Sequence, residues 1–175
     1  MNKLTNTRSK SWGESFAVYA HPPVVAMLFL GFAAGLPFLL VFSTLSAWLT
    51  EADVSRATIG FFSWVGITYS IKFFWAPVVD RLPIPGLTAL FGRRRSWMLL
   101  AQVGIAAGII GMANCDPRTE LAMVAGFALL VAFSSATQDI SIDAWRIEAA
   151  KIELQGAMAA TYQAGYRIAL LVTGA

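Results

Sequence analysis

The chain has 175 residues, of which 57% are hydrophobic and only 13% are charged. An ordinary soluble domain carries about 25% charged residues, so this composition argues against a soluble domain and indicates an integral membrane protein. The formal net charge is +3, but the basic residues lie between apolar runs, which argues against nucleic-acid binding. With one cysteine and one histidine there is no zinc-ligand cluster, and we expect neither a metal nor a cofactor.

Five apolar runs follow one another along the chain, and a helix needs about 20 such residues to cross the hydrocarbon core. The runs cover 24–50, 58–79, 96–113, 121–142 and a stretch that begins near 156 and continues to the last residue. The first run is too long for the apolar part of a signal peptide, and Pro37 should bend it. We therefore predict an all-α, polytopic membrane helix bundle over residues 24–175, preceded by a cytoplasmic segment over residues 1–23.

The basic residues predict which side of the membrane each loop occupies. Lys3, Arg8 and Lys10 precede the first run, and Arg81 and the run 93–95 lie between the second and third, whereas the other loops are mainly acidic. Cytoplasmic loops carry an excess of Lys and Arg, so we expect a cytoplasmic amino terminus.

Glycine pairs four residues apart occur in two of the apolar runs. They are Gly31 with Gly35 and Gly104 with Gly108. Small residues at this spacing let two helix backbones approach closely, so each pair is a candidate helix contact.

Four ionisable residues lie inside the predicted spans: Lys72, Asp139, Asp143 and Arg167. Each costs at least about 2.5 kcal/mol in hydrocarbon and must face a cavity, a partner or the interface. A rise of 1.5 Å per residue places Lys72 about 12 Å and Asp139 about 10 Å from the cytoplasmic ends of their helices, so they share a level. Arg167 lies about 17 Å in, near the midplane, where transporters bind their substrates.

Asp139 and Asp143 are four residues apart and project from the same face of one helix. Two acids this close in a low-dielectric setting make each other harder to ionise, which suits groups that take up and release a proton. Asp139, Asp143 and Lys72 are therefore candidates for proton coupling. The alternatives are a static Lys72–Asp139 ion pair, and an Asp143 that simply pairs with Arg146 or Arg81 near the interface.

A charged clasp links the second predicted span to the third. Asp80 and Arg81 end one span, and Gly92, Arg93, Arg94 and Arg95 open the next after a short spacer. An acid facing an arginine run across one loop predicts a latch that holds one conformation of a transporter.

These residues together resemble the AmpG-type muropeptide permeases of the major facilitator superfamily. The elements that carry the resemblance are Lys72-Phe73-Phe74-Trp75-Ala76-Pro77, Asp80-Arg81, Gly92-Arg93-Arg94-Arg95-Ser96-Trp97, the run 136–144 with its Gln138-Asp139 and Asp143-Ala144 pairs, and Gly165-Tyr166-Arg167. The resemblance extends from about Gly31 onward and implies the amino-terminal part of a major facilitator superfamily fold.

The resemblance implies proton-driven import of anhydromuropeptides from periplasm to cytoplasm for peptidoglycan recycling, and a link to β-lactamase induction. It also implies the bacterial inner membrane, and partners limited to lipid, the muropeptide and protons, with a monomer at full length. Because muropeptides carry carboxylates, Arg167 is the expected anchor, and Gln138 and Tyr166 are further candidate contacts.

A facilitator is built from two halves of six helices each, and five spans cannot provide both halves. We therefore expect an amino-terminal fragment. The same branch of the superfamily includes acetyl-CoA carriers, so another anionic solute is an alternative substrate. A second alternative is a non-transporting signalling or assembly subunit that pairs its buried charges with a partner's helices. No nucleophile and base pair, metal cluster or phosphate loop supports an enzyme.

Overall fold

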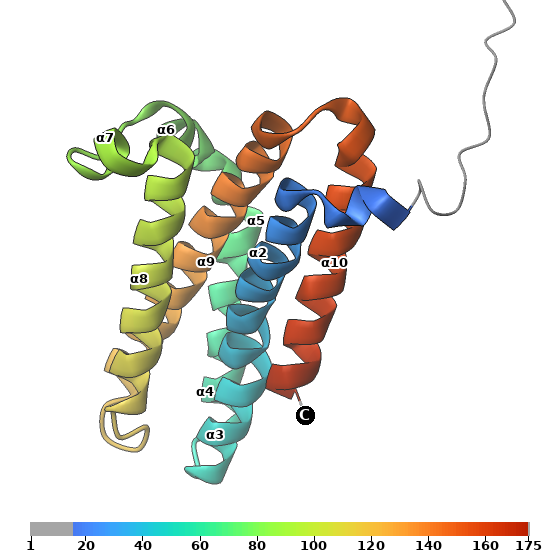
Figure 1. Ribbon diagram of the computed structural model, residues 1–175. Helices are drawn as coiled ribbons and strands as arrows, with labels where there is room; N and C mark the ends of the chain where they lie inside the picture. Colours follow the sequence, from blue (N-terminus) through green and yellow to red (C-terminus); the bar gives the residue numbers. More distant parts are fainter. Residues whose placement is uncertain (1–15, 175) are drawn as a thin grey trace, which may run out of the picture.

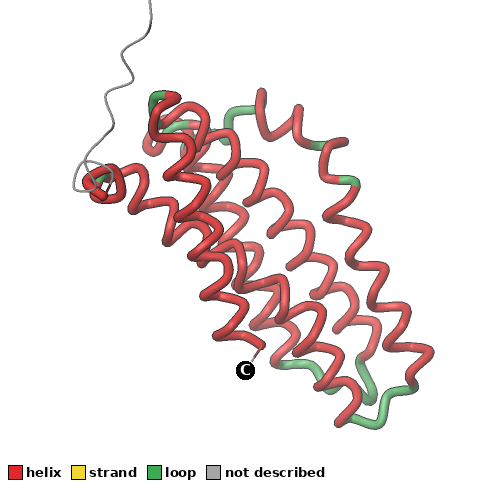
Figure 2. The backbone as a smooth tube through the Cα atoms, turned by 90° about the vertical axis from the view of Figure 1, so that its right-hand side faces the viewer, coloured by secondary structure: helices red, strands yellow, loops and turns green. Residues whose placement is uncertain are grey.

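A computed structural model describes residues 16–174, and within this range the chain forms helices and no strands (Figures 1 and 2). Three of the helical stretches are long and apolar enough to cross a membrane: Pro22–Glu51, Arg93–Ala113 and Leu121–Ala149. The prediction of an all-α membrane helix bundle is confirmed. Lys3, Arg8 and Lys10, which contributed to the predicted orientation, lie outside the described residues.

The first span agrees with its predicted limits. After the short helix η1 (Val18–Ala20) it runs through α2 (Pro22–Leu39), the π-helical segment η2 (Leu40–Thr44) and α3 (Leu45–Glu51). Pro37 lies inside α2 and has no N–H to donate to the carbonyl of Ala33. The π segment begins three residues later, so the irregularity expected at Pro37 takes the form of a change in helical hydrogen bonding.

The second predicted span, 58–79, is interrupted and does not form one continuous helix. It is divided into α4 (Arg56–Phe62), η3 (Ser63–Gly66), α5 (Ile67–Ser70), η4 (Lys72–Phe74) and α6 (Ala76–Arg81). Ser55 caps the start of α4 by accepting from the Thr58 N–H at 3.2 Å. Pro77 removes one backbone donor and contributes to the break before α6.

The remaining helices are α7 (Leu87–Phe91), α8 (Arg93–Ala113), α9 (Leu121–Ala149) and α10 (Ile152–Gly174). The short helix α7 was not predicted, and α9 continues two turns beyond its predicted end at Ile142. The α10 helix is long enough to cross a membrane but has polar residues through its middle, so its crossing, like that of the interrupted second span, stays a prediction.

Glycines bring the main helices together in pairs. At Gly31 and Gly35 of α2 an added Cβ would meet the backbone of Tyr162 and Tyr166 of α10, and at Gly165 it would meet Leu28 of α2. At Gly104 and Gly108 of α8 an added Cβ would meet the side chains of Ser134 and Val131 of α9. The predicted role of both glycine pairs in close helix approach is confirmed.

Two apolar cores hold the bundle together. One joins α3, α8 and α9 through Leu49, Met112 and Val124, and the other joins α2, α9 and α10 through Met27, Ile142 and Met158. The start of α2, the α6–α7 region and the α9–α10 turn all lie at one end of the bundle (Figure 1). This end, called the α7 end below, carries the charged clasp.

Candidate functional site

Lys72 and Asp139 form an ion pair inside the bundle. The Nζ atom of Lys72 lies 3.6 Å from Oδ2 of Asp139, and the side chains are 35% and 20% exposed. The helices thus bring together the two residues predicted to share a level. The other carboxylate oxygen, Oδ1, is buried and has no hydrogen-bond partner among the described residues. That oxygen is free to accept a proton or a hydrogen bond.

The surroundings of Asp139 are aromatic and hydroxyl-bearing. Tyr162 and Tyr166 of α10 pack against the apolar core that contains Ile142, about one turn along α9 from Asp139. The rings of Tyr162 and Tyr166 are 6.2 Å apart. Phenol hydroxyls can donate and accept hydrogen bonds, so these tyrosines are candidates for contact with a polar solute.

Asp143 lies one helical turn from Asp139 but in a different setting. Its side chain is 58% exposed, and its Oδ1 atom is 3.6 Å from Nη2 of Arg146 on the same helix. The pairing with Arg146 is one of the two ion pairs, with Arg146 or with Arg81, that the sequence offered as alternatives to proton coupling. A role of Asp143 in proton coupling stays a prediction.

The three candidate substrate contacts occupy different environments. Arg167 is exposed on α10 and forms no ion pair within residues 16–174, whereas the neighbouring Tyr166 is half-buried. Gln138 is 1% exposed, and neither atom of its amide is hydrogen-bonded in the described part of the chain. It follows Ser134 by four residues and therefore lies on the face of α9 that meets α8. Its assignment as a substrate contact stays a prediction.

The clasp forms through one of its arginines. Nη1 of Arg94 lies 2.5 Å from Oδ1 of Asp80, and the same guanidinium donates to Oε1 of Glu148, from Nε at 3.0 Å and from Nη2 at 2.8 Å. Gly92 precedes α8 with φ of 79°, a backbone conformation that favours glycine. Within the described range, Arg81, Arg93 and Arg95 form no ion pair.

Glu148 is the functional candidate that sequence reasoning missed. It lies near the end of α9, two residues after Arg146, and nothing local to it indicates an arginine partner. Only the antiparallel course of α8 and α9 places it beside Arg94. The clasp therefore connects three helices, α6, α8 and α9, where the sequence predicted a contact across one loop.

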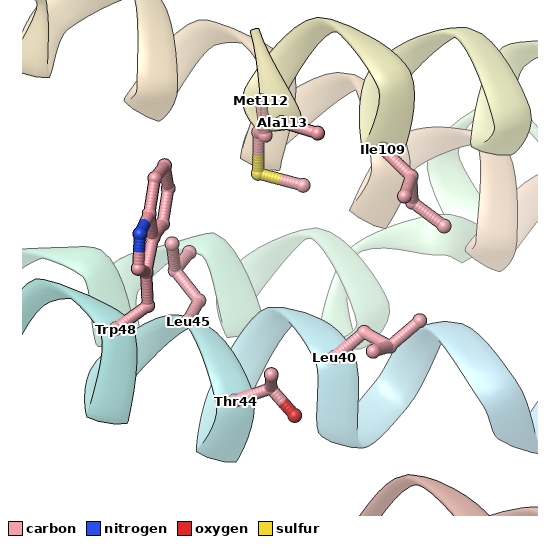
Figure 3. Close-up of a pocket in the computed structure, with 7 residues that line it drawn as sticks. All are labelled: Leu40, Thr44, Leu45, Trp48, Ile109, Met112 and Ala113. Atoms are coloured by element: carbon pink, nitrogen blue, oxygen red, sulfur yellow. The ribbon is translucent and has the colours of Figure 1, made fainter. Parts of the chain in front are cut away.

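Two apolar cavities lie between the first span and α8. One holds about 450 Å³, and in Figure 3 Trp48 and Leu45 of α3 extend toward Met112 and Ala113 of α8. It contains no charged side chain and none of the predicted site residues. The other, of about 550 Å³, lies nearer the α7 end and has Arg95 as its one charged lining residue. Neither cavity is the Lys72–Asp139 site.

Comparisons with known proteins agree with the motifs. A family model described as acetyl-coenzyme A transporter 1 matches residues 24–117, which is more than half of the chain. The anhydromuropeptide permease of Escherichia coli K12 is 43% identical over 157 residues, covering 90% of this chain and 31% of the permease. A Rickettsia conorii protein named transporter AmpG 4 is 39% identical over 146 residues, covering 83% of this chain and 35% of that protein. No solved structure gives a significant match.

The predicted resemblance to AmpG-type permeases is confirmed by these relatives. The chain spans about a third of the length of the curated relatives it matches.

Proposed function

The chain belongs to the acetyl-coenzyme A transporter 1 family, and from this premise we propose that it is the amino-terminal bundle of a proton-driven permease that imports anhydromuropeptides. The observation that carries the transport part is the Lys72–Asp139 ion pair, which lies at an interruption of a membrane helix. Ionisable residues within membrane helices mark substrate or proton pathways, and transporters build their sites at broken helices.

Proton coupling follows from the two states of Asp139. When Asp139 is ionised it attracts Lys72 and ties η4 to α9; when it is protonated the attraction is lost and Lys72 is released. Release of Lys72, together with opening of the Asp80–Arg94–Glu148 clasp, allows the bundle to move against the rest of the permease. Asp143 supplies a second carboxylate one turn away.

The substrate part of the proposal comes from the relatives. A named relative is an anhydromuropeptide permease, and it is similar over 90% of this chain. Muropeptides carry carboxylates and sugar hydroxyls, which match an exposed arginine and a set of tyrosines. Arg167 binds the carboxylates in this scheme, and Tyr166 and Tyr162 face the hydroxyl groups.

The orientation is proposed from charge. The α7 end carries Arg81, the run 93–95, Arg146 and Lys151, whereas Asp53, Asp116 and Glu120 lie near the other end. An excess of basic residues marks the cytoplasmic side, so the α7 end faces the cytoplasm, and the membrane is the bacterial inner membrane.

The test expresses the complete coding sequence in cells that lack their own muropeptide permease. Uptake of labelled anhydromuropeptide should require a proton gradient, and Asp139→Asn should abolish gradient-driven uptake while the amount of protein in the membrane stays normal. Normal uptake by Asp139→Asn would contradict the coupling role.

A second substrate is favoured by the family model, whose description names acetyl-coenzyme A. Uptake of labelled acetyl-CoA into vesicles, with no uptake of muropeptide, would support that carrier. Absence of both activities from a well-inserted protein would favour the non-transporting subunit.

A further inference from the structure

Trp75 attaches the interrupted second span to α9. Its Nε1–H donates to Oγ1 of Thr137 at 3.1 Å, and its ring centre lies 4.8 Å from that of Phe133. Thr137 is 4% exposed, and its own hydroxyl donates to the Phe133 carbonyl at 2.8 Å. The hydroxyl proton is therefore committed to α9, and the oxygen is left to accept from the indole.

The segment that Trp75 attaches has little other support. Lys72 belongs to η4, a 3₁₀ helix of three residues, and Phe73 and Phe74 are 62% and 71% exposed. Within residues 16–174, the Trp75–Thr137 bond is the one side-chain hydrogen bond between segment 71–76 and another helix, and Lys72–Asp139 is the one ion pair. Short 3₁₀ segments have poor internal hydrogen bonding, so their position depends on such attachments.

The two attachments are close to each other on both sides of the contact. Trp75 follows Lys72 by three residues, and Thr137 precedes Asp139 by two. The ion-pair separation of 3.6 Å is too long for a strong direct hydrogen bond, so the pair does not fix its own geometry. The indole–hydroxyl hydrogen bond, at 3.1 Å, is directional.

We propose that Trp75 is a positioning residue, which holds Lys72 at its distance from Asp139 through the hydrogen bond to Thr137. This inference rests on the proposed function, because it concerns the residues that we assign to proton coupling. Lys72 from η4 faces Asp139, Asp143 lies one turn along its own helix, and Tyr162 and Tyr166 from α10 pack against the core that contains Ile142, about one turn from Asp139. Among them Lys72 is the cation whose distance Trp75 sets.

The test removes the hydrogen bond and keeps the ring. Trp75→Phe retains an aromatic contact with Phe133 but has no N–H, and Thr137→Val retains shape but has no acceptor. Thr137→Ser keeps the acceptor. Trp64→Phe is the matched control, because Trp64 lies in the same span, is 68% exposed and makes no side-chain hydrogen bond within the described chain.

Two readouts are made on the product of the complete coding sequence. Trp75→Phe and Thr137→Val should lower gradient-driven uptake about fivefold, the factor expected for one net hydrogen bond, and move the midpoint of the pH profile upward because the nearby cation is no longer held. Thr137→Ser and Trp64→Phe should match the unmodified protein.

The second readout does not require transport. An amine-reactive reagent should modify Lys72 faster in Trp75→Phe and Thr137→Val than in the two controls, with Lys151 as the internal reference in peptide mass spectrometry. Unchanged Lys72 reactivity, or an unchanged pH profile in an active protein, would overturn the positioning role. Absence of uptake from the unmodified protein would overturn the proposed function alone, and Lys72 reactivity would still decide the positioning role.

Discussion

Arg94 and Glu148 are 54 residues apart in the sequence and are joined by two hydrogen bonds at the α7 end of the bundle. The same guanidinium holds Asp80, so one side chain that is 13% exposed connects α6, α8 and α9. Arginine suits this position because its planar fork presents several donors at once.

Removing either acid of the clasp should destabilise the protein modestly. Asp80→Asn and Glu148→Gln should each cost about 0.5 to 1 kcal/mol, because both carboxylates are half-exposed. The loss of stability in the double variant should differ from the sum of the losses in the two single variants, because both acids share Arg94. Thermal unfolding in detergent measures this. Glu153→Gln, which removes an acid without an ion pair in the described part, is the control, and strict additivity would contradict a shared clasp.

The glycine contacts between α2 and α10 should tolerate no side chain. Gly31→Ala and Gly165→Ala place a methyl group against the backbone of Tyr162 and Leu28, and overpacking of this kind costs about 1 to 3 kcal/mol. The readout is the thermal unfolding midpoint together with the amount of protein in the membrane.

The matched control is Gly156→Ala on the same helix α10. A Cβ at Gly156 meets nothing within 4 Å, and alanine is the better helix former, so this variant should be neutral or slightly stabilising. Equal destabilisation by all three substitutions would show that the effect does not come from the α2–α10 contact.

The stability of the protein should fall when either Lys72 or Asp139 loses its charge, and should recover when both charges are removed. Lys72→Met or Asp139→Asn leaves a largely buried charge without its partner, which we expect to cost about 1 to 3 kcal/mol. The double variant Lys72→Met with Asp139→Asn should recover stability but not proton-coupled uptake. Thermal unfolding in detergent tests the stability statement, and uptake by the same variants tests the coupling statement.

Lys151→Met is the control for the loss of a lysine, because Lys151 is exposed and makes no ion pair within residues 16–174. A double variant that is less stable than both single variants would contradict the pairing.

Arg167 should affect substrate binding without affecting stability. Arg167→Ala removes a charged donor that is exposed in this bundle, and loss of a hydrogen bond to a charged ligand should raise the KM for muropeptide uptake about tenfold or more. Arg167→Lys, which keeps the charge but loses the planar fork, should have a smaller effect.

The control for Arg167 is Arg56→Ala, which removes an exposed arginine from α4. An unchanged KM in Arg167→Ala, at a normal membrane level, would remove Arg167 from the substrate site.

The sequence by itself determined the class of the protein. Hydropathy and helical rise are local properties, so the runs at 24–50, 96–113 and 121–142 located the three helices long and apolar enough to span a membrane, and the same counting placed Lys72 beside Asp139. The family resemblance came from motifs that match those of AmpG-type permeases, among them Asp80-Arg81 and the run 136–144.

Only the tertiary structure decided which charges meet and how the second span is built. Glu148 pairs with Arg94 because α8 and α9 pack side by side, and Gln138, although polar, is buried within the bundle. The interrupted second span is attached to α9 through Trp75 and Thr137, which are 62 positions apart. Contacts between distant segments depend on how whole helices pack, and no local pattern of hydropathy or charge encodes that arrangement.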